Sequence, residues 1–455
     1  MAKGTVSEVG ADGTAIDYAA IVTAWSSEER AEREKKFLRK IDYRLLPILI
    51  VMYVLNYIDR NALPQARIQG IEKDIGLVGV EYNIVLSLTF IGYILAPFFA
   101  GVAFLFSGWY TRKELGLRLG IFFCAAMFSG AFGGLFAAGI QAAFADNPLG
   151  SWRFLFIIEG AATVFFACLT AFVIPDWPAT TKWLSEEEKA LGVIRLIEDA
   201  GEEETEIKTM DAFKMAAKDY RVWLCILGQM CLQAVASLTN FLPTLVKAFG
   251  YSTINTLLLT APPYIFTAFF CLYNTWHSDK TSTRSPHIIY PTIGAIVGII
   301  ITIATTNNAA RYFALFLMLP GTYGCFQISN AWMANIAARP QKKRAIGLAM
   351  NNAIGNLALV WTPYLYPESD GPRYLTAWSV NLALAVVTLV SSVILSWCLR
   401  KDNKKLEEAI AAGWTVEEGE GVMEQKAGLA AHHEAPTAGR PLGGNKAGAV
   451  AKYDI

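Results

Sequence analysis

Residues 288–306 read IIYPTIGAIVGIIITIATT, a run of 19 residues without a charged side chain. A helix needs about 20 mainly apolar residues to cross about 30 Å of hydrocarbon. Lipid offers backbone groups no hydrogen-bond partners, so segments of this kind must be helical. The sequence therefore predicts an all-α, polytopic membrane bundle of ten spans. The other nine are expected at 45–65, 82–109, 115–143, 152–174, 222–246, 254–276, 311–335, 345–366 and 375–399.

The composition supports a membrane protein and argues against several other classes. Hydrophobic residues make up 54% of the chain and charged residues 17%, against roughly 45–50% and about 25% in soluble domains. Lys plus Arg equals Asp plus Glu, at 39 each, so no nucleic-acid partner is indicated. The seven cysteines lie in apolar blocks, and the four histidines have no metal-ligand spacing. We expect no enzyme activity, no catalytic residues, no metal and no cofactor.

The distribution of Lys and Arg predicts the orientation in the membrane. Basic clusters precede the first span and follow the second, sixth, eighth and tenth, whereas the loop 144–151 contains none. Because cytoplasmic loops carry the excess of Lys and Arg, both termini are expected in the cytosol. The predicted parts are a cytosolic N-terminal segment, a four-span bundle, a cytosolic central loop, a six-span bundle and a disordered cytosolic tail: 1–44, 45–174, 175–221, 222–399 and 400–455.

The two bundles are unequal, and weak internal similarity indicates where they differ. Asn61–Pro64 (NALP) resembles Asn240–Pro243 (NFLP), and Gly116 and Gly347 each lie at the start of a span behind basic residues. Asn61 lies 55 positions before Gly116, whereas Asn240 lies 107 positions before Gly347, so the two intervals differ by 52. That difference corresponds to about two spans with short loops.

Several motifs resemble one transporter family. The run 56–74, NYIDRNALPQARIQGIEKD, is similar to the first span and loop of fungal anion:cation symporters, the allantoate and nicotinate permease-like branch of the major facilitator superfamily. Similar motifs occur at 108–114 (GWYTRKE), 152–160 (WRFLFIIEG), 183–188 (WLSEEE) and 258–264 (LLTAPPY), so the resemblance covers roughly 35–405. It implies a secondary transporter that moves a small organic anion, a carboxylate nutrient or vitamin, by proton symport. We expect a monomer in the lipid bilayer of the plasma membrane.

The chain departs from this family at one place. Members have twelve spans and carry an acidic residue directly before Ala-Pro-Phe-Phe, whereas here Leu95 precedes 96–99. The front of a second span is thus joined to the back of a fourth, which predicts ten spans in place of twelve. With that acid lost, any transport is expected to depend weakly on pH or to be confined to exchange. The alternative is a transport-defective truncated product, either a mis-spliced gene model or a membrane interaction protein.

The first span carries the strongest candidate residues, because ionisable groups inside a span are costly. Arg60 is expected to bind the substrate carboxylate, since a guanidinium keeps its charge and binds bidentately. Asp59 is the candidate for proton coupling. The resemblance implies the same two roles. The alternative is that Arg60 extends to the outer interface or pairs with an acid. Helical spacing places these substrate-binding candidates on one face: Tyr53, Asn56, Tyr57 and Arg60.

A third acid in a span, Glu159, is expected to pair with Arg153 at the membrane interface rather than to function. The second bundle supplies polar stripes that either line a substrate cavity or hydrogen-bond between helices. We predict substrate binding for five of these residues: Gln233, Asn240, Tyr323, Gln327 and Asn330.

The topology predicts different accessibility for two loops. Asn147→Cys should react with an impermeant thiol reagent added outside intact cells, and Lys343→Cys should not. The unsubstituted chain, whose cysteines all lie in apolar blocks, is the control. Protection of residue 147 together with labelling of residue 343 would reverse the predicted orientation.

Overall fold

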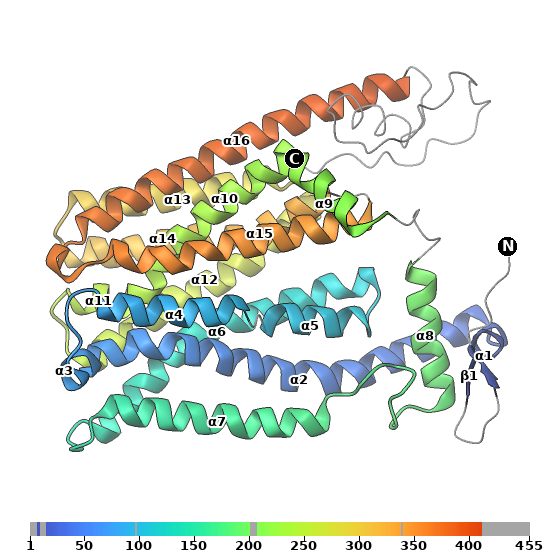
Figure 1. Cartoon of the computed structure of the whole chain (residues 1–455), viewed down its shortest axis with the longest axis horizontal. Helices are drawn as coiled ribbons and strands as arrows, with labels where there is room; N and C mark the ends of the chain where they lie inside the picture. The colour runs from blue at the N-terminus through green and yellow to red at the C-terminus, as the bar shows by residue number, and fades with distance from the viewer. Residues whose placement is uncertain (1–6, 10–14, 96–97, 201–206, 338–339, 412–455) are drawn as a thin grey trace. The chain divides into compact units, whose positions relative to one another are not determined.

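The computed structural model describes residues 7–9, 15–95, 98–200, 207–337 and 340–411. These residues are almost entirely helical, which confirms the predicted all-α class (Figure 1). The exception is a short antiparallel hairpin of β1 (Ser7–Val9) and β2 (Ala15–Asp17). Contacts divide the chain into two compact units. The N-terminal unit comprises Met1–Leu63 and Leu95–Glu203, and the C-terminal unit comprises Pro64–Ile94 and Glu204–Ile455.

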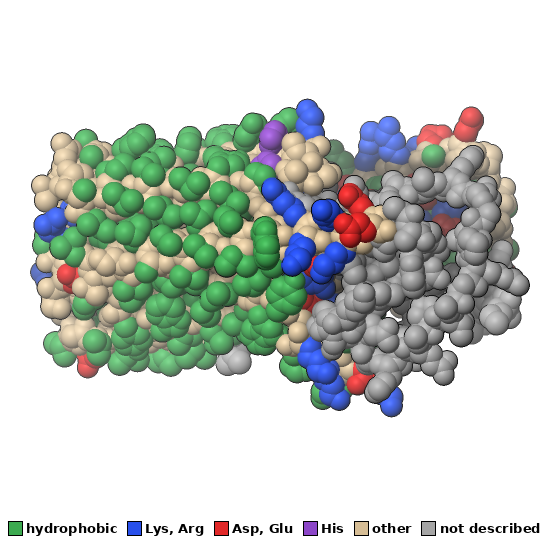
Figure 2. All heavy atoms as spheres, turned by 90° about the horizontal axis from the view of Figure 1, so that it is seen from above, with side chains coloured by type: hydrophobic (Ala, Val, Ile, Leu, Met, Phe, Trp, Pro, Cys, Tyr) green, Lys and Arg blue, Asp and Glu red, His purple; other side chains and the backbone are tan. Residues whose placement is uncertain are grey.

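Within the described ranges, seven helical stretches are long and apolar enough to cross a membrane: Ser27–Ile68, Arg118–Phe144, Ser151–Val173, Tyr220–Lys247, Thr253–Thr281, Ser285–Ala304 and Leu375–Lys405. Two further predicted spans fall on α14 (Asn308–Ile336) and α15 (Gln341–Trp361), which are long but do not meet that combined test. Figure 2 shows one face of the molecule on which hydrophobic side chains cover a broad area, with Lys, Arg, Asp and Glu gathered beside it.

The second predicted span, 82–109, differs from the expectation of one long helix. The structure has α4 (Glu81–Leu95) and α5 (Phe98–Ser107), on either side of residues 96–97, which lie outside the described residues. At 1.5 Å per residue, α4 extends about 22 Å and α5 about 15 Å, so neither alone crosses the hydrocarbon. Residues 64–94 also group with the C-terminal helices, whereas the sequence placed them in the first bundle.

The N-terminal unit is built around α2 (Ser27–Ile68), a 42-residue helix in which the basic N-terminal segment continues into the first span. Its other helices are α1 (Tyr18–Thr23), α5, α6 (Arg112–Phe144), α7 (Ser151–Val173) and α8 (Glu186–Ala200). Ser185 and Glu188 form a reciprocal cap of α8, with N–O distances of 2.9 and 3.2 Å. Ion pairs tie the polar ends of these helices together, including Lys40–Glu188 and Arg118–Asp42, both at 2.7 Å.

The C-terminal unit contains most of the membrane-length helices. Besides α4, α14 and α15 it has α3 (Ile71–Ile75), α9 (Thr209–Lys218), α10 (Tyr220–Ala236), η1 (Ser237–Phe241), α11 (Leu242–Lys247), α12 (Thr253–Thr281), α13 (Ser285–Ala304), η2 (Thr362–Leu365), η3 (Glu368–Asp370) and α16 (Leu375–Ala411). Because α16 continues to Ala411, the tail predicted from residue 400 is helical over its first part. Residues 412–455 lie outside the described residues.

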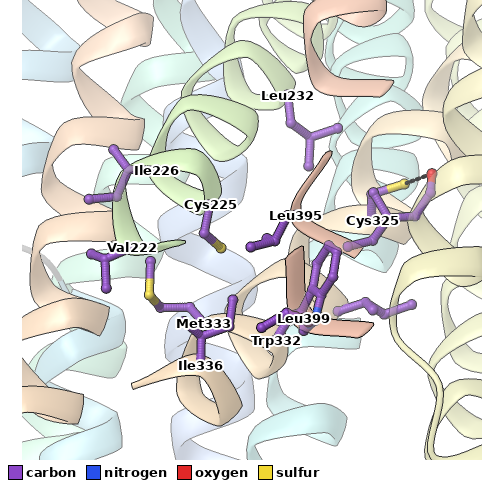
Figure 3. Close-up of a cluster of buried hydrophobic side chains, with 12 residues drawn as sticks. Val222, Cys225, Ile226, Leu232, Cys325, Trp332, Met333, Ile336, Leu395 and Leu399 are labelled. Atoms are coloured by element: carbon purple, nitrogen blue, oxygen red, sulfur yellow. Dashed lines mark hydrogen bonds between the residues drawn. The ribbon is translucent and has the colours of Figure 1, made fainter. Parts of the chain in front are cut away.

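The core of this unit is a layer of apolar side chains from α10, α13, α14 and α16 (Figure 3). Val222, Trp332 and Leu399 are each at most 2% exposed. Helices α13 and α14 approach closely at Gly298, where an added Cβ would lie 2.9 Å from the carbonyl oxygen of Ala314. Such contacts between backbones need small residues, because van der Waals packing replaces the hydrophobic effect in lipid.

A buried charge cluster closes the cytosolic end predicted for this unit. Asp219 is 0% exposed and receives two hydrogen bonds from the Arg221 guanidinium, each at 3.0 Å. Lys343, 1% exposed, lies 3.3 Å from the same carboxylate. Burial alone would raise the pKa of Asp219, but the Arg221 hydrogen bonds and the charges of Arg221 and Lys343 outweigh burial and lower the pKa.

Candidate functional site

The polar stripe predicted on the first span is present on α2, but its members have different surroundings. Tyr53 is 2% exposed, and its ring stacks on Phe122 of α6 with centroids 4.1 Å apart. Tyr53 also meets the ring of Tyr57 edge to face, with centroids 5.0 Å apart. Tyr53 is therefore part of the apolar packing between α2 and α6, rather than an open wall of a cavity.

Arg60 lies one turn beyond Tyr57, at the partly buried end of this stripe. Its guanidinium carbon is 5.3 Å from the centre of the Tyr57 ring, which is a cation–π distance. The side-chain oxygen of Asn56 is buried and has no hydrogen-bond partner. A cation and an unpartnered amide oxygen thus occupy neighbouring turns of one helix.

Asp59 contacts a different helix. Its carboxylate accepts a hydrogen bond from the Thr163 hydroxyl of α7 at 2.8 Å. Thr163 was not among the predicted residues, since a threonine in an apolar block carries no functional pattern by itself. This bond makes Asp59 a partly buried carboxylate held between α2 and α7.

Glu159 lies one helical turn from Thr163, on the same face of α7. It is 3% exposed, and neither of its carboxyl oxygens has a hydrogen-bond partner. Its charge interacts with that of Asp59. The expected pairing with Arg153 is wrong, because Arg153 donates to the Leu149 carbonyl oxygen and stacks on Trp152 at 4.2 Å. The sequence shows only that Glu159 is an acid inside an apolar block. The fold is needed to show that Glu159 lies beside Asp59.

The predicted residues of the C-terminal unit form several hydrogen-bonded pairs rather than one cluster. Gln233 donates to Asn356 at 3.2 Å, and the Tyr323 hydroxyl lies 3.0 Å from that of Thr239. Asn330 accepts from Asn351 at 3.0 Å, an interhelical bond between α14 and α15. Asn240 is 2% exposed, and its amide nitrogen has no partner. Gln327 is partly buried on the same helix as Tyr323 and Asn330.

Sequence reasoning did not single out Arg67, which the structure places in an aromatic setting in the C-terminal unit. Its guanidinium stacks on Tyr82 at 4.2 Å and pairs with Glu72 at 2.9 Å. Arg67 and Glu72 line a cavity of about 360 Å³, together with Thr244 and Tyr374. No group of three or more His, Cys, Asp or Glu in the described ranges is placed to hold a metal ion.

Solved structures with a similar fold are membrane transporters. The xylose transporter XylE from E. coli in a partially occluded inward-open conformation has a TM-score of 0.52 and 14% identity, covering 77% of this chain and 97% of that one. A bacterial homologue of the human lysosomal transporter Spinster, inward-facing and unoccupied, has the same TM-score and 15% identity, covering 82% and 97%. At these identities the likeness concerns the fold alone.

Curated fungal relatives are similar in sequence over most of their length. An uncharacterised transporter of Schizosaccharomyces pombe is 27% identical, covering 84% of this chain and 86% of its own. A major facilitator-type transporter of Emericella nidulans is 27% identical, covering 83% and 88%. The high-affinity nicotinic acid transporter of Saccharomyces cerevisiae is 24% identical, covering 83% and 80%. The family model described as Major Facilitator Superfamily matches residues 75–363, more than half of the chain. The chain is therefore a member of the Major Facilitator Superfamily and a multi-pass membrane transporter.

Proposed function

We propose that this transporter moves a small organic anion, a carboxylate nutrient or vitamin, by proton symport as a monomer in the plasma membrane. The observation that carries the proposal is the α2–α7 cluster: Asp59 bonded to Thr163, with the buried carboxyl of Glu159 one turn away. Arg60 follows Asp59 in the sequence and supplies a fixed positive charge. A symporter needs both a group that binds the anion and a group that exchanges a proton.

The anion part of the proposal is supported by the chemistry of Arg60. A planar guanidinium that keeps its charge can bind a carboxylate through two parallel hydrogen bonds. The Tyr57 ring lies beneath this guanidinium and Asn56 is on the same face, so polar and aromatic contacts are available to a ring-bearing acid. The relative named as a nicotinic acid transporter is consistent with an aromatic monocarboxylate as substrate. In the C-terminal unit, we propose Asn240, Gln233, Tyr323, Gln327 and Asn330 as further substrate contacts.

The proton part is supported by the second carboxyl, which the sequence analysis had set aside. Burying an ionised carboxylate without a partner costs several kcal/mol, so proton uptake at such a site is favoured. Besides Glu159 itself, the charged groups of the membrane-embedded parts of α2 and α7 are Asp59, Arg60 and Arg153, and residues 119–144 of α6 contribute none. Glu159 therefore takes the place of the acid lost at Leu95, and we expect clear pH dependence in place of the weak dependence predicted from sequence.

We also propose that the N-terminal unit lacks two helices of the family's twelve, as its motifs predict, and that the chain belongs to the anion:cation symporter branch. The alignment with the S. pombe relative extends over 436 residues but uses 84% of the 455 residues here, about 382. It therefore leaves about 54 positions without a residue of this chain, close to the 52 expected from the two internal intervals. In addition, only 6% of the most apolar stretch of α7 is buried, against 72% for Tyr220–Lys247.

The missing helices predict a specific result at the transcript level. Complementary DNA amplified across the Leu95/Ala96 junction should include a product about 50–65 codons longer, the length of two spans and their loops. Amplification across residues 250–300, where no helix is missing, should give one length only. Transcripts that all match this chain across the junction would instead show that ten spans are the mature form.

Arg60→Ala and Arg60→Lys should each reduce uptake of labelled nicotinate or allantoate by about tenfold or more. This is the effect expected when the substrate loses one charge-assisted hydrogen bond. Lysine keeps the charge but not the planar fork. Surface expression is measured in parallel, and Arg153→Ala is the control, because Arg153 contacts Leu149 and Trp152 close to it in the sequence. Normal uptake by Arg60→Ala at equal surface expression would assign Arg60 to a structural role.

Glu159→Gln should abolish proton-driven accumulation while leaving exchange of labelled for unlabelled anion. Glutamine fills the same space but cannot exchange a proton, so the ratio of uptake at pH 5 to uptake at pH 7.5 should fall towards one. Asp59→Asn should have the same effect. Glu186→Gln, at an exposed site on α8, is the matched control and should retain the pH ratio. An unchanged pH ratio in Glu159→Gln would remove Glu159 from the coupling step.

A further inference from the structure

A second positively charged site lies in the C-terminal unit, at the start of α14 and in the loop before α16. Arg311 belongs to the first turn of α14 and is only 7% exposed. Arg373 follows η3 in the loop before α16 and is exposed. Both side chains line one small cavity of about 20 Å³, together with Thr302, Met318 and Trp378. The predicted topology puts this cavity at the extracellular end of the unit.

Among the described residues, neither arginine forms an ion pair with an acid. Both side chains line the same small cavity, so their like charges face one another there. The Nε of Arg311 is buried with no hydrogen-bond partner. Arg373 donates to the carbonyl oxygen of Ile303 at 3.2 Å. Asp370, the acid three residues from Arg373, accepts instead from the backbone N–H of Thr376 at 2.8 Å.

The position of Arg311 on α14 adds to this imbalance. The first turn of a helix carries a partial positive charge from its free N–H groups, and acidic residues are usually favoured there. Here a buried cation occupies that turn, and the first turn of α14 has no acid. The other cavity walls are mainly apolar, including Leu245, Phe249 and Leu315, so the charge is weakly screened.

We infer that Arg311 and Arg373 bind a small monovalent anion, such as chloride or the carboxylate end of a small acid. An anion there would accept hydrogen bonds from the guanidinium groups, including the unpartnered Nε–H of Arg311. Its negative charge would offset two positive charges that otherwise repel each other. The cavity exceeds the roughly 10–15 Å³ that one water requires, so it suits a single small ion rather than a whole nutrient molecule. This binding site is independent of the proposed transport function, since it needs neither Arg60 nor Glu159.

To test this, the Tm of the purified full chain is measured in detergent with sodium gluconate as the salt. The gluconate is then replaced stepwise by sodium chloride or by sodium acetate at constant ionic strength. A ligand that binds only the folded chain raises Tm in a saturable way. We expect such a rise with at least one small anion, while bulky gluconate serves as the reference. A rise with chloride alone identifies an inorganic ion, and a rise with acetate identifies a carboxylate.

Arg311→Gln and Arg373→Gln should each raise the midpoint, the anion concentration at which half of the Tm rise is reached, by about tenfold or more. This is the effect of a lost charge-assisted hydrogen bond. Lys247→Gln also removes one positive charge but leaves both arginines, and its midpoint should not change. If Arg311→Gln does not fold, iodide quenching of Trp378 in the unsubstituted chain, with Trp378→Phe as the blank, gives the same information. No saturable Tm rise with either anion, or equal midpoints in all three variants, would overturn the inference.

Discussion

The hydrocarbon core of a bilayer offers no hydrogen-bond partner to a polar group, and most of this structure follows from that constraint. Backbone groups satisfy one another in long helices, and many hydroxyl side chains within the spans bond to carbonyl oxygens of their own helix. Thr292, for example, donates to the carbonyl oxygen of Ile288 at 2.7 Å. Against this background, a buried carboxyl without a partner, as at Glu159, is unusual. Such a group persists only where function or a ligand compensates its cost.

The two units meet this constraint to different degrees. The C-terminal unit surrounds its buried layer with helices on several sides, and Trp332 and Met333 are almost fully enclosed. In the N-terminal unit, α7 leaves bulky side chains such as Val164, Phe165 and Phe172 exposed. Lipid can cover apolar side chains at no cost, so a helix with such an exposed face can still insert into a membrane. It cannot cover charged groups in this way, which is why the polar contacts between α2 and α7 are the informative part of this unit.

Charged residues near the predicted cytosolic ends of the helices form ion pairs with one another. Asp219, Arg221 and Lys343 are nearly inaccessible to solvent, and breaking one partner of such a set leaves the others unpaired at a cost of about 3–5 kcal/mol. Because the pKa of Asp219 is lowered, its stabilising contribution is present above the usual pKa of an aspartate and is lost only in stronger acid. These pairs therefore hold the helix ends together at ordinary pH, whereas no acid among the described residues pairs with Arg311 or Arg373 in this way.

The amino-acid sequence determined the helices, because membrane spans depend on the length and apolarity of local segments. It also pointed to Arg60 and Asp59, since charged residues inside an apolar block stand out without knowledge of their neighbours. The partners of those residues depend on contacts between distant segments: Thr163 lies 104 positions from Asp59, and Arg373 lies 62 positions from Arg311. Helical spacing by itself puts Arg153 and Glu159, both on α7, about 120° apart around the helix axis. Only the packing of α7 against α2 placed Glu159 beside Asp59. The tertiary structure alone decided which residues Glu159 contacts. One face of a helix can pack against any of several neighbouring helices, and the sequence of that helix does not specify which neighbour it will be.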